Sequence, residues 1–150
     1  MKIYLATDHA GFKLKEKLKI FLRDLGYEVE DCGAFVLDEN DDYPDFVSVA
    51  ARKVAEDSEN NKAIVFGGSG QGEAIVANRV KGVRAIVVYN YNEDIIKLSR
   101  LHNNANVLSL GARFLNEEEG KKALKLWLET DFLGEERHKG RIEKTDLIRE

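Results

Sequence analysis

Short runs rich in apolar residues alternate with longer amphipathic segments along this chain. The runs at 3–6, 63–66, 83–89 and 106–110 have the length of strands, and the sequence EVED at 28–31 is a further candidate. Between them, apolar residues recur every three or four positions, which is the spacing of a helix with one buried face. The clearest example is the set Leu14, Leu18, Phe21, Leu22 and Leu25.

This βαβα alternation predicts an α/β protein with a five-stranded parallel sheet between two helical layers, a three-layer α/β/α sandwich. The run at 83–89 is almost wholly apolar, as expected of a strand covered on both faces. Helix boundaries are also predicted. Pro44 suits a first helical turn, Asn92 and Asn116 suit N-caps, and Gly26 suits a helix end. The helix that follows 63–66 is expected to run to about Arg79.

Length and composition fit a single domain over 1–150. The chain has 150 residues, of which 43% are hydrophobic. Its net charge of −4 predicts no nucleic-acid partner. Cys32 is the only cysteine, which excludes an intrachain disulfide, and we interpret it as structural. The N-terminus does not resemble a signal peptide and no segment approaches a membrane span, so we expect a cytoplasmic protein.

The segment 135–150 has a helical pattern but few large apolar residues, namely Ile142, Leu147 and Ile148. Such a helix buries little against its own domain. It is therefore either a frayed end or a C-terminal helical tail that docks on a second subunit.

The sequence GGSGQGE at 67–73 is the strongest chemical signal. Four glycines lie in six positions directly after a predicted strand. One glycine is enough for a turn, so four suggest that something approaches the backbone closely. The loop lacks the Lys and Ser/Thr of a P-loop, and it does not match G-x-G-x-x-G. Glu73 would also repel a nearby phosphate. An oxyanion hole with a carboxylate base beside it fits better.

Several stretches together resemble ribose-5-phosphate isomerase of type B, in the family that includes galactose-6-phosphate isomerase subunits. The six pieces follow the family's order and span nearly the whole chain: ATDHAGF at 6–12, DDYPDF at 41–46, GGSGQGEAIVANR at 67–79, GVRA at 82–85, HNNANVLSLGAR at 102–113 and RHKGR at 137–141. The resemblance implies a flavodoxin-like sheet, no cofactor and no metal. It also implies a homodimer or tetramer whose active sites draw on two subunits, and an aldose–ketose isomerisation through a cis-enediolate.

The resemblance also implies roles for individual residues. Many members carry a cysteine base at the position of Gly67; this chain resembles the branch whose base is a glutamate, here Glu73. Ser69 would hold the enediolate oxygens, together with backbone N–H groups of the loop, and His102 would protonate the ring oxygen to open the furanose. The expected substrate-binding residues are Asp8, His9, Gly68, Gly70, Gly72, Asn103, Arg113, Arg137 and Arg141.

Each role has a plainer alternative. Glu73 could be a helix-start acid favoured by the helix dipole, Ser69 a turn serine, and His102 a core histidine on the face of Ile95 and Leu98. Arg137 and Arg141, spaced i,i+4, either form a phosphate clamp or are simply solvated. The residues alone do not assign His138.

Ribose 5-phosphate is the substrate that the resemblance favours. An isomerase for a six-carbon aldose 6-phosphate, such as galactose or allose 6-phosphate, is the nearest alternative. A non-catalytic sugar-phosphate-binding protein and a flavodoxin-like FMN binder are others. The sequence leaves open the length of the sugar and the choice between dimer and tetramer.

Overall fold

The structure, a computed structural model, describes residues 1–148. Its centre is a parallel sheet of five strands in the order β2-β1-β3-β5-β4. The predicted fold class is confirmed. The strands are β1 (Lys2–Thr7), β2 (Glu28–Asp31), β3 (Lys62–Gly67), β4 (Ala85–Val88) and β5 (Val107–Gly111).

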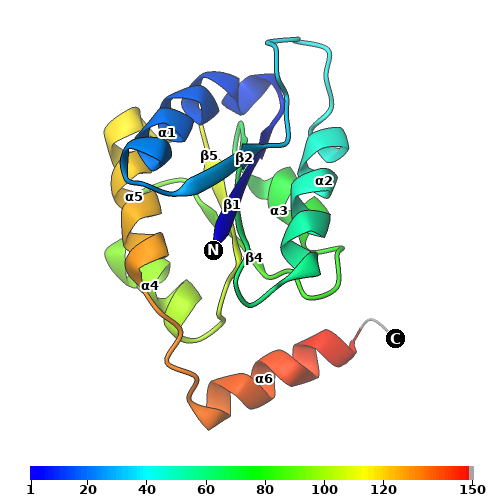
Figure 1. The fold of residues 1–150 in the computed structure, drawn as a ribbon, viewed down its shortest axis with the longest axis vertical. Coiled ribbons are helices and arrows are strands. Elements are labelled where there is room, and N and C mark those ends of the chain that lie inside the picture. Colours follow the sequence, from blue (N-terminus) through cyan, green and yellow to red (C-terminus); the bar gives the residue numbers. More distant parts are fainter. Residues whose placement is uncertain (149–150) are drawn as a thin grey trace.

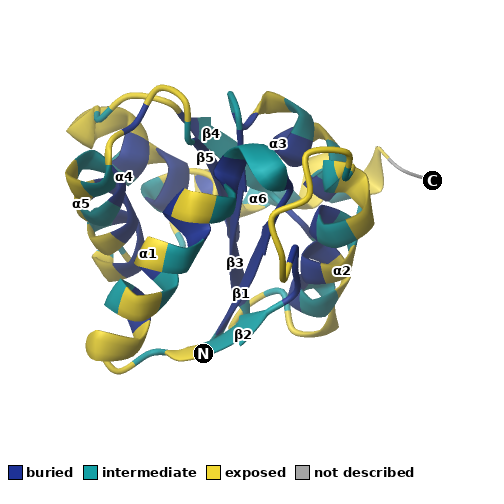
Figure 2. Ribbon diagram, turned by 90° about the horizontal axis from the view of Figure 1, so that it is seen from above, coloured by how far each residue is buried: buried dark blue, intermediate teal, exposed yellow. Residues whose placement is uncertain are grey.

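Helices cover both faces of this sheet, and the three layers are visible from above in Figure 2. One layer contains α1 (Phe12–Asp24), α4 (Glu93–Leu101) and α5 (Glu117–Glu129); the other contains α2 (Tyr43–Glu56) and α3 (Gln71–Ala77). A short 3₁₀ turn, η1 (His9–Gly11), leads into α1, and α6 (Glu136–Leu147) follows α5. None of the helices within residues 1–148 has both the length and the apolarity needed to cross a bilayer.

The two faces of the sheet carry separate hydrophobic clusters, which fix the positions of the strand ends. On the first face, Leu18 and Leu22 of α1 and Trp127 of α5 are fully buried against the strands. On the second face, Val47 and Val54 of α2 are fully buried. Strands held from both sides give a rigid frame, so the loops at their ends are precisely placed.

The predicted helix boundaries are confirmed where a side chain makes the cap. Asn92 accepts a hydrogen bond from the N–H of Ile95 at 3.1 Å, and Asn116 accepts one from Glu119 at 2.8 Å. Pro44 lies in the first turn of α2. Gly26 has a φ of +88° just beyond α1, a conformation that glycine adopts without steric cost.

Two elements differ from the prediction. Strand β4 is shorter than 83–89 and lies at the sheet edge, where three of its four residues are only half-buried. Helix α3 ends at Ala77, before Arg79. The reason is Asn78, whose side chain donates to the carbonyl of Ala85 at 3.0 Å and accepts from its N–H at 2.8 Å. These bonds turn the chain toward β4 and stop the helix.

Helix α6 lies apart from the two helical layers, across the end of the sheet where the strands begin (Figure 1). The tail is helical as predicted, and within its described part only His138 is buried. Leu147 is 62% exposed and Ile148 is 80% exposed. Residues 149 and 150 of the predicted tail lie outside the described residues. Docking of this tail on a second subunit stays a prediction.

Candidate active site

A hollow of about 290 Å³ opens at the carboxyl ends of β1 and β3. Parallel sheets place their ligand sites at this edge, because the loops after the strands converge there. The hollow brings together seven of the predicted site residues, which come from the three segments that follow β1, β3 and β5. They are Asp8, His9, Gly68, Ser69, Gly72, Glu73 and Arg113; Ala10 and Tyr43 also line it.

The glycine-rich loop is held in shape by its neighbours. Gly70 has a φ of +80° and caps α3, and its carbonyl accepts a hydrogen bond from the hydroxyl of Ser109 at 2.5 Å. The carbonyl of Gly68 accepts from the N–H of Arg113 at 3.0 Å. Ser69 accepts from the N–H of Gln71 at 3.3 Å, so it makes the turn contact considered as its alternative role. That contact uses a lone pair of the oxygen and leaves the hydroxyl hydrogen for another acceptor.

Glu73 lies in the first turn of α3 and is only 4% exposed. Burial raises the pKa of its carboxyl group, and the negative charge of Asp8 raises it further, while a hydrogen bond from its own backbone N–H opposes them. A base that works near neutral pH benefits from such a shift, because a more basic carboxylate accepts protons better. Glu73 therefore has the environment of a general base.

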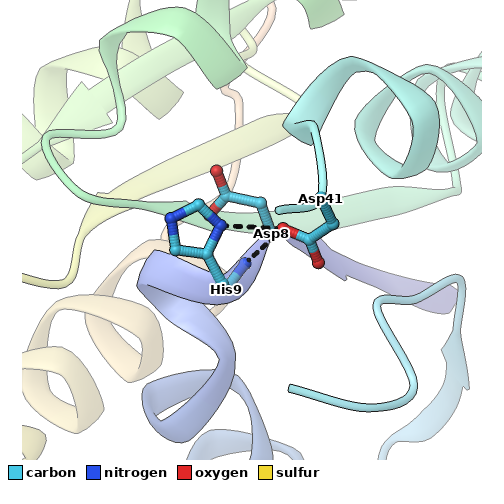
Figure 3. A group of neighbouring side chains, drawn as sticks. All are labelled: Asp8, His9 and Asp41. Carbon is cyan, nitrogen blue, oxygen red and sulfur yellow. Dashed lines mark hydrogen bonds and ion pairs between the residues drawn. The ribbon is translucent and has the colours of Figure 1, made fainter. Parts of the chain in front are cut away.

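His9 and Asp8 lie directly after β1 in the η1 turn. Asp8 caps this turn by accepting a hydrogen bond from the N–H of Ala10 at 2.9 Å. Asp41 lies in the loop before α2. Its Oδ1 accepts a hydrogen bond from the backbone N–H of His9 at 2.9 Å and pairs with Nδ1 of the His9 ring at 2.8 Å (Figure 3). The hydrogen bond with Asp41 raises the pKa of His9; burial and the charge of Arg113 oppose it.

The remaining predicted residues lie at the opposite edge of the sheet. His102 follows the last turn of α4, Asn103 comes next, and Arg137 and Arg141 belong to α6. Strand β3 is six residues long, so the two edges are about 20 Å apart. Within one chain, His102 cannot reach a substrate held beside Glu73.

These residues form a second group of their own at the amino ends of the strands. Asn103 and Arg141 line one hollow of about 370 Å³ between α6 and β4. The ring of His102, which is exposed, stacks on that of His138 with their centroids 4.2 Å apart. His138 thus packs against His102, and the interpretation of His102 as a core histidine is wrong. We call this group the amino-edge half-site, and the group around Glu73 the carboxyl-edge half-site.

A metal ion has one conceivable position among residues 1–148. Asp8, His9 and Asp41 each offer a ligand atom, all within 4.8 Å of one another. Nδ1 of His9 and Oδ1 of Asp41 are already bonded to one another at 2.8 Å, and the Asp8 carboxylate caps the η1 turn. We therefore assign this group to hydrogen bonding. The expectation of a site without metal or cofactor stays a prediction.

Comparison with known proteins decides the family. The sequence profile of the ribose/galactose isomerase family matches residues 3–145. The chain belongs to this family. The resemblance drawn from the six sequence pieces is confirmed.

Individual members of the ribose/galactose isomerase family are similar over almost their full length. Ribose-5-phosphate isomerase B of Mycolicibacterium paratuberculosis is 38% identical over 95% of this chain and 88% of its own. The crystal structure of ribose-5-phosphate isomerase B from Mycoplasma genitalium with bound ribulose-5-phosphate superposes with a TM-score of 0.93 at 39% identity. It covers 98% of this chain and 95% of its own. The enzyme from Clostridium thermocellum gives a TM-score of 0.91.

Sequence reasoning missed two residues of the carboxyl-edge half-site, Tyr43 and Asp41. Both belong to the family piece DDYPDF, to which the resemblance assigns no role. Tyr43 lies against Gly72, where an added Cβ would be 2.6 Å from its hydroxyl. Nothing in the spacing of the sequence shows that this loop folds over the ends of β1 and β3, so no signal pointed to either residue.

Gly67 leaves the space that the carboxyl group of Glu73 occupies. A Cβ placed on Gly67 would lie 2.0 Å from Oε1 of Glu73. The obstacle is the end of a flexible side chain, so we expect Gly67→Ala to fold and to displace the carboxylate instead. A displacement of about 1 Å costs on the order of 10²-fold in rate. The measurement is kcat together with the thermal midpoint; an unchanged kcat would contradict the assigned position of the Glu73 carboxylate.

Proposed function

We propose that this protein interconverts ribose 5-phosphate and ribulose 5-phosphate through a cis-enediolate. The observation that carries the proposal is the buried Glu73 carboxylate, with its raised pKa, in a hollow at the carboxyl edge of the sheet. Membership of the ribose/galactose isomerase family and the ribulose-5-phosphate bound in the Mycoplasma genitalium enzyme support it.

Glu73 moves the proton in this proposal. Its carboxylate removes the proton from C2 of the open-chain aldose and returns it to C1, while a proton passes from O2 to O1. The negative charge of the enediolate rests on O1 and O2, beside Ser69 and the backbone N–H groups of Gly70 and Gly72. Asp8 binds sugar hydroxyl groups next to the base. No net charge or electron is exchanged with the solvent.

A second subunit completes the site. The separation of about 20 Å between the two edges of the sheet supports a site in which the amino-edge half-site of one chain serves the carboxyl-edge half-site of another. The exposed apolar residues Ile95 and Leu98 on α4, one and two turns before His102, give the partner a surface to bury. We therefore propose a homodimer, alone or as half of a tetramer, with shared active sites.

The partner's half-site supplies ring opening and phosphate binding. His102 of the partner subunit donates a proton to the ring oxygen as the bond from that oxygen to C1 breaks. Arg137 and Arg141 of the partner subunit bind the phosphate, one turn apart on the same face of α6. Asn103 of the partner, with His9 and Arg113 of the first chain, completes the contacts.

A sugar phosphate carries charge that does not cross a bilayer unaided, which is consistent with a cytoplasmic enzyme.

A four-carbon substrate is the second candidate. D-erythrulose-4-phosphate isomerase 2 of Mycolicibacterium smegmatis is 38% identical over 88% of this chain. The identity to this enzyme equals that to the ribose-5-phosphate isomerase B of Mycolicibacterium paratuberculosis, so overall similarity does not separate the two substrates.

A turnover assay tests the proposal. Purified protein is given four-, five- and six-carbon aldose phosphates under identical conditions, and kcat/KM is compared. We expect the highest value with ribose 5-phosphate. A higher value with an erythrose or a hexose phosphate would assign the chain to that substrate, and no turnover of any of them would favour a binding protein.

A further inference from the structure

Asp41 makes a paired contact with His9 that the proposed reaction does not use. Both bonds end on the same carboxylate oxygen, Oδ1, which accepts from the backbone N–H at 2.9 Å and from Nδ1 at 2.8 Å (Figure 3). The first bond fixes the η1 turn and the second fixes the ring. Asp41 therefore determines both the position of His9 and the nitrogen that carries its proton.

The Asp41 side chain is costly for the fold in this position. It is 9% exposed, and its second oxygen, Oδ2, is buried with no hydrogen-bond partner among the described residues. A neutral side chain of the same shape would fix the turn without burying a charge. Such a cost is typical of a residue kept for the function of a site.

The negative charge of Asp41 affects which protonation form the His9 ring presents to the hollow. Because Nδ1 donates to Asp41, the neutral ring would present the bare lone pair of Nε2 to an anion. Only the doubly protonated ring presents an N–H there. Asp41 and Asp8 both favour that cation, while Arg113 opposes it.

We propose that Asp41 is a positioning residue that keeps His9 in its cationic form, with Nε2–H directed at the phosphate of the substrate. This proposal rests on the proposed function for the identity of the anion. Asp41 touches neither the sugar nor the reacting carbons; it acts through His9. It adds a positioning residue to the substrate contact that the proposed function already assigns to His9.

The test is Asp41→Asn, which keeps an oxygen for both hydrogen bonds and removes the charge. Asp38→Asn is the matched control, since Asp38 lies in the same loop and accepts from the backbone N–H of Asn40 at 3.0 Å. Below the pH at which His9 loses its proton in either protein, the variant and wild type should have similar KM values. Between the pH at which the His9 ring of the variant loses its proton and the pH at which the wild-type ring does, KM of Asp41→Asn should be roughly tenfold higher, with kcat little changed. Taking the ratio of KM values at each pH cancels the titration of the substrate's own phosphate.

If the ratio of the KM of Asp41→Asn to that of wild type is the same at every pH, Asp41 has a purely structural role and the proposal is overturned. An Asp38→Asn variant with the same profile as Asp41→Asn would also overturn it.

Nuclear magnetic resonance provides a readout that does not depend on catalysis. The chain has only three histidines, and the signal of His9 is identified by its loss in His9→Asn. We expect the His9 titration midpoint to lie above that of an ordinary histidine and to fall in Asp41→Asn.

An ordinary or lowered midpoint in the wild-type protein would overturn the proposal even if Asp41→Asn fails to fold. If the midpoint behaves as expected but no aldose phosphate is turned over, the proposed function fails and the pairing stands. Titration of both proteins with inorganic phosphate then decides whether the cationic His9 ring binds that anion. Equal phosphate affinities across that pH range would overturn the proposal.

Discussion

Replacing Glu73 with Gln is expected to lower kcat by about 10²–10⁴-fold, the usual contribution of a general base. The amide has almost the same shape as the carboxylate and cannot accept the proton from C2. Substrate affinity should change little, because the phosphate is held elsewhere. Steady-state kinetics with ribose 5-phosphate measure both quantities, and turnover near that of wild type would show that another group is the base.

The thermal midpoint of Glu73→Gln separates lost chemistry from lost structure. Burial raises the pKa of Glu73 in the folded protein, so the folded state binds its proton more tightly than the unfolded chain does. Stability therefore falls as the pH rises from the unfolded pKa through the folded pKa, and the charged form is the costly one. At pH 7 the neutral glutamine removes that cost. We expect the variant to be at least as stable as wild type.

The same pKa shift predicts the acid limb of the wild-type activity profile. The base works only as a carboxylate, so activity should be lost as the pH falls through the raised pKa of Glu73, at a higher pH than for an exposed glutamate.

His102→Asn is expected to lower activity on ribose 5-phosphate by about 10²-fold and to spare a substrate that cannot close its ring. The reason is that the proposed mechanism assigns His102 to opening the furanose and not to proton transfer between C1 and C2. A four-carbon aldose phosphate provides the comparison, because its chain is too short for a phosphorylated furanose. Losses of equal size on both substrates would contradict this division of roles.

The matched control for His102→Asn is His138→Asn. His138 stacks on the His102 ring without being assigned a proton-transfer role. His138→Asn should change the ratio of the activities on the five- and four-carbon substrates less than His102→Asn does.

Much of the fold could be predicted from the sequence, because periodicity and capping are local properties. Leu18, Leu22, Asn92 and Asn116 do what their spacing and chemistry predict. Strand β4 was predicted to be longer and covered on both faces, since an apolar run does not reveal a position at the sheet edge.

The candidate site was predictable only as a set of residue types. The glycine-rich loop and Glu73 follow one strand, so they could be placed together from the sequence. Tyr43 lines the same hollow and Asp41 pairs with His9. Both lie at the end of a long loop whose path depends on tertiary packing. The separation of His102 from Glu73 appears only once the strand order and the direction of α4 are fixed. This separation is the structural observation that supports the proposed shared site.

Mixing Glu73→Gln with His102→Asn tests the shared site most directly. Each protein alone lacks one essential group in every site. After subunit exchange, a mixed dimer has one site with both groups intact, Glu73 from one chain and His102 from the other. Randomly paired subunits should then recover about a quarter of the wild-type activity on ribose 5-phosphate. If exchange is confirmed by mass spectrometry and activity stays at the level of the separate variants, both groups act within one chain and the two-chain account is wrong.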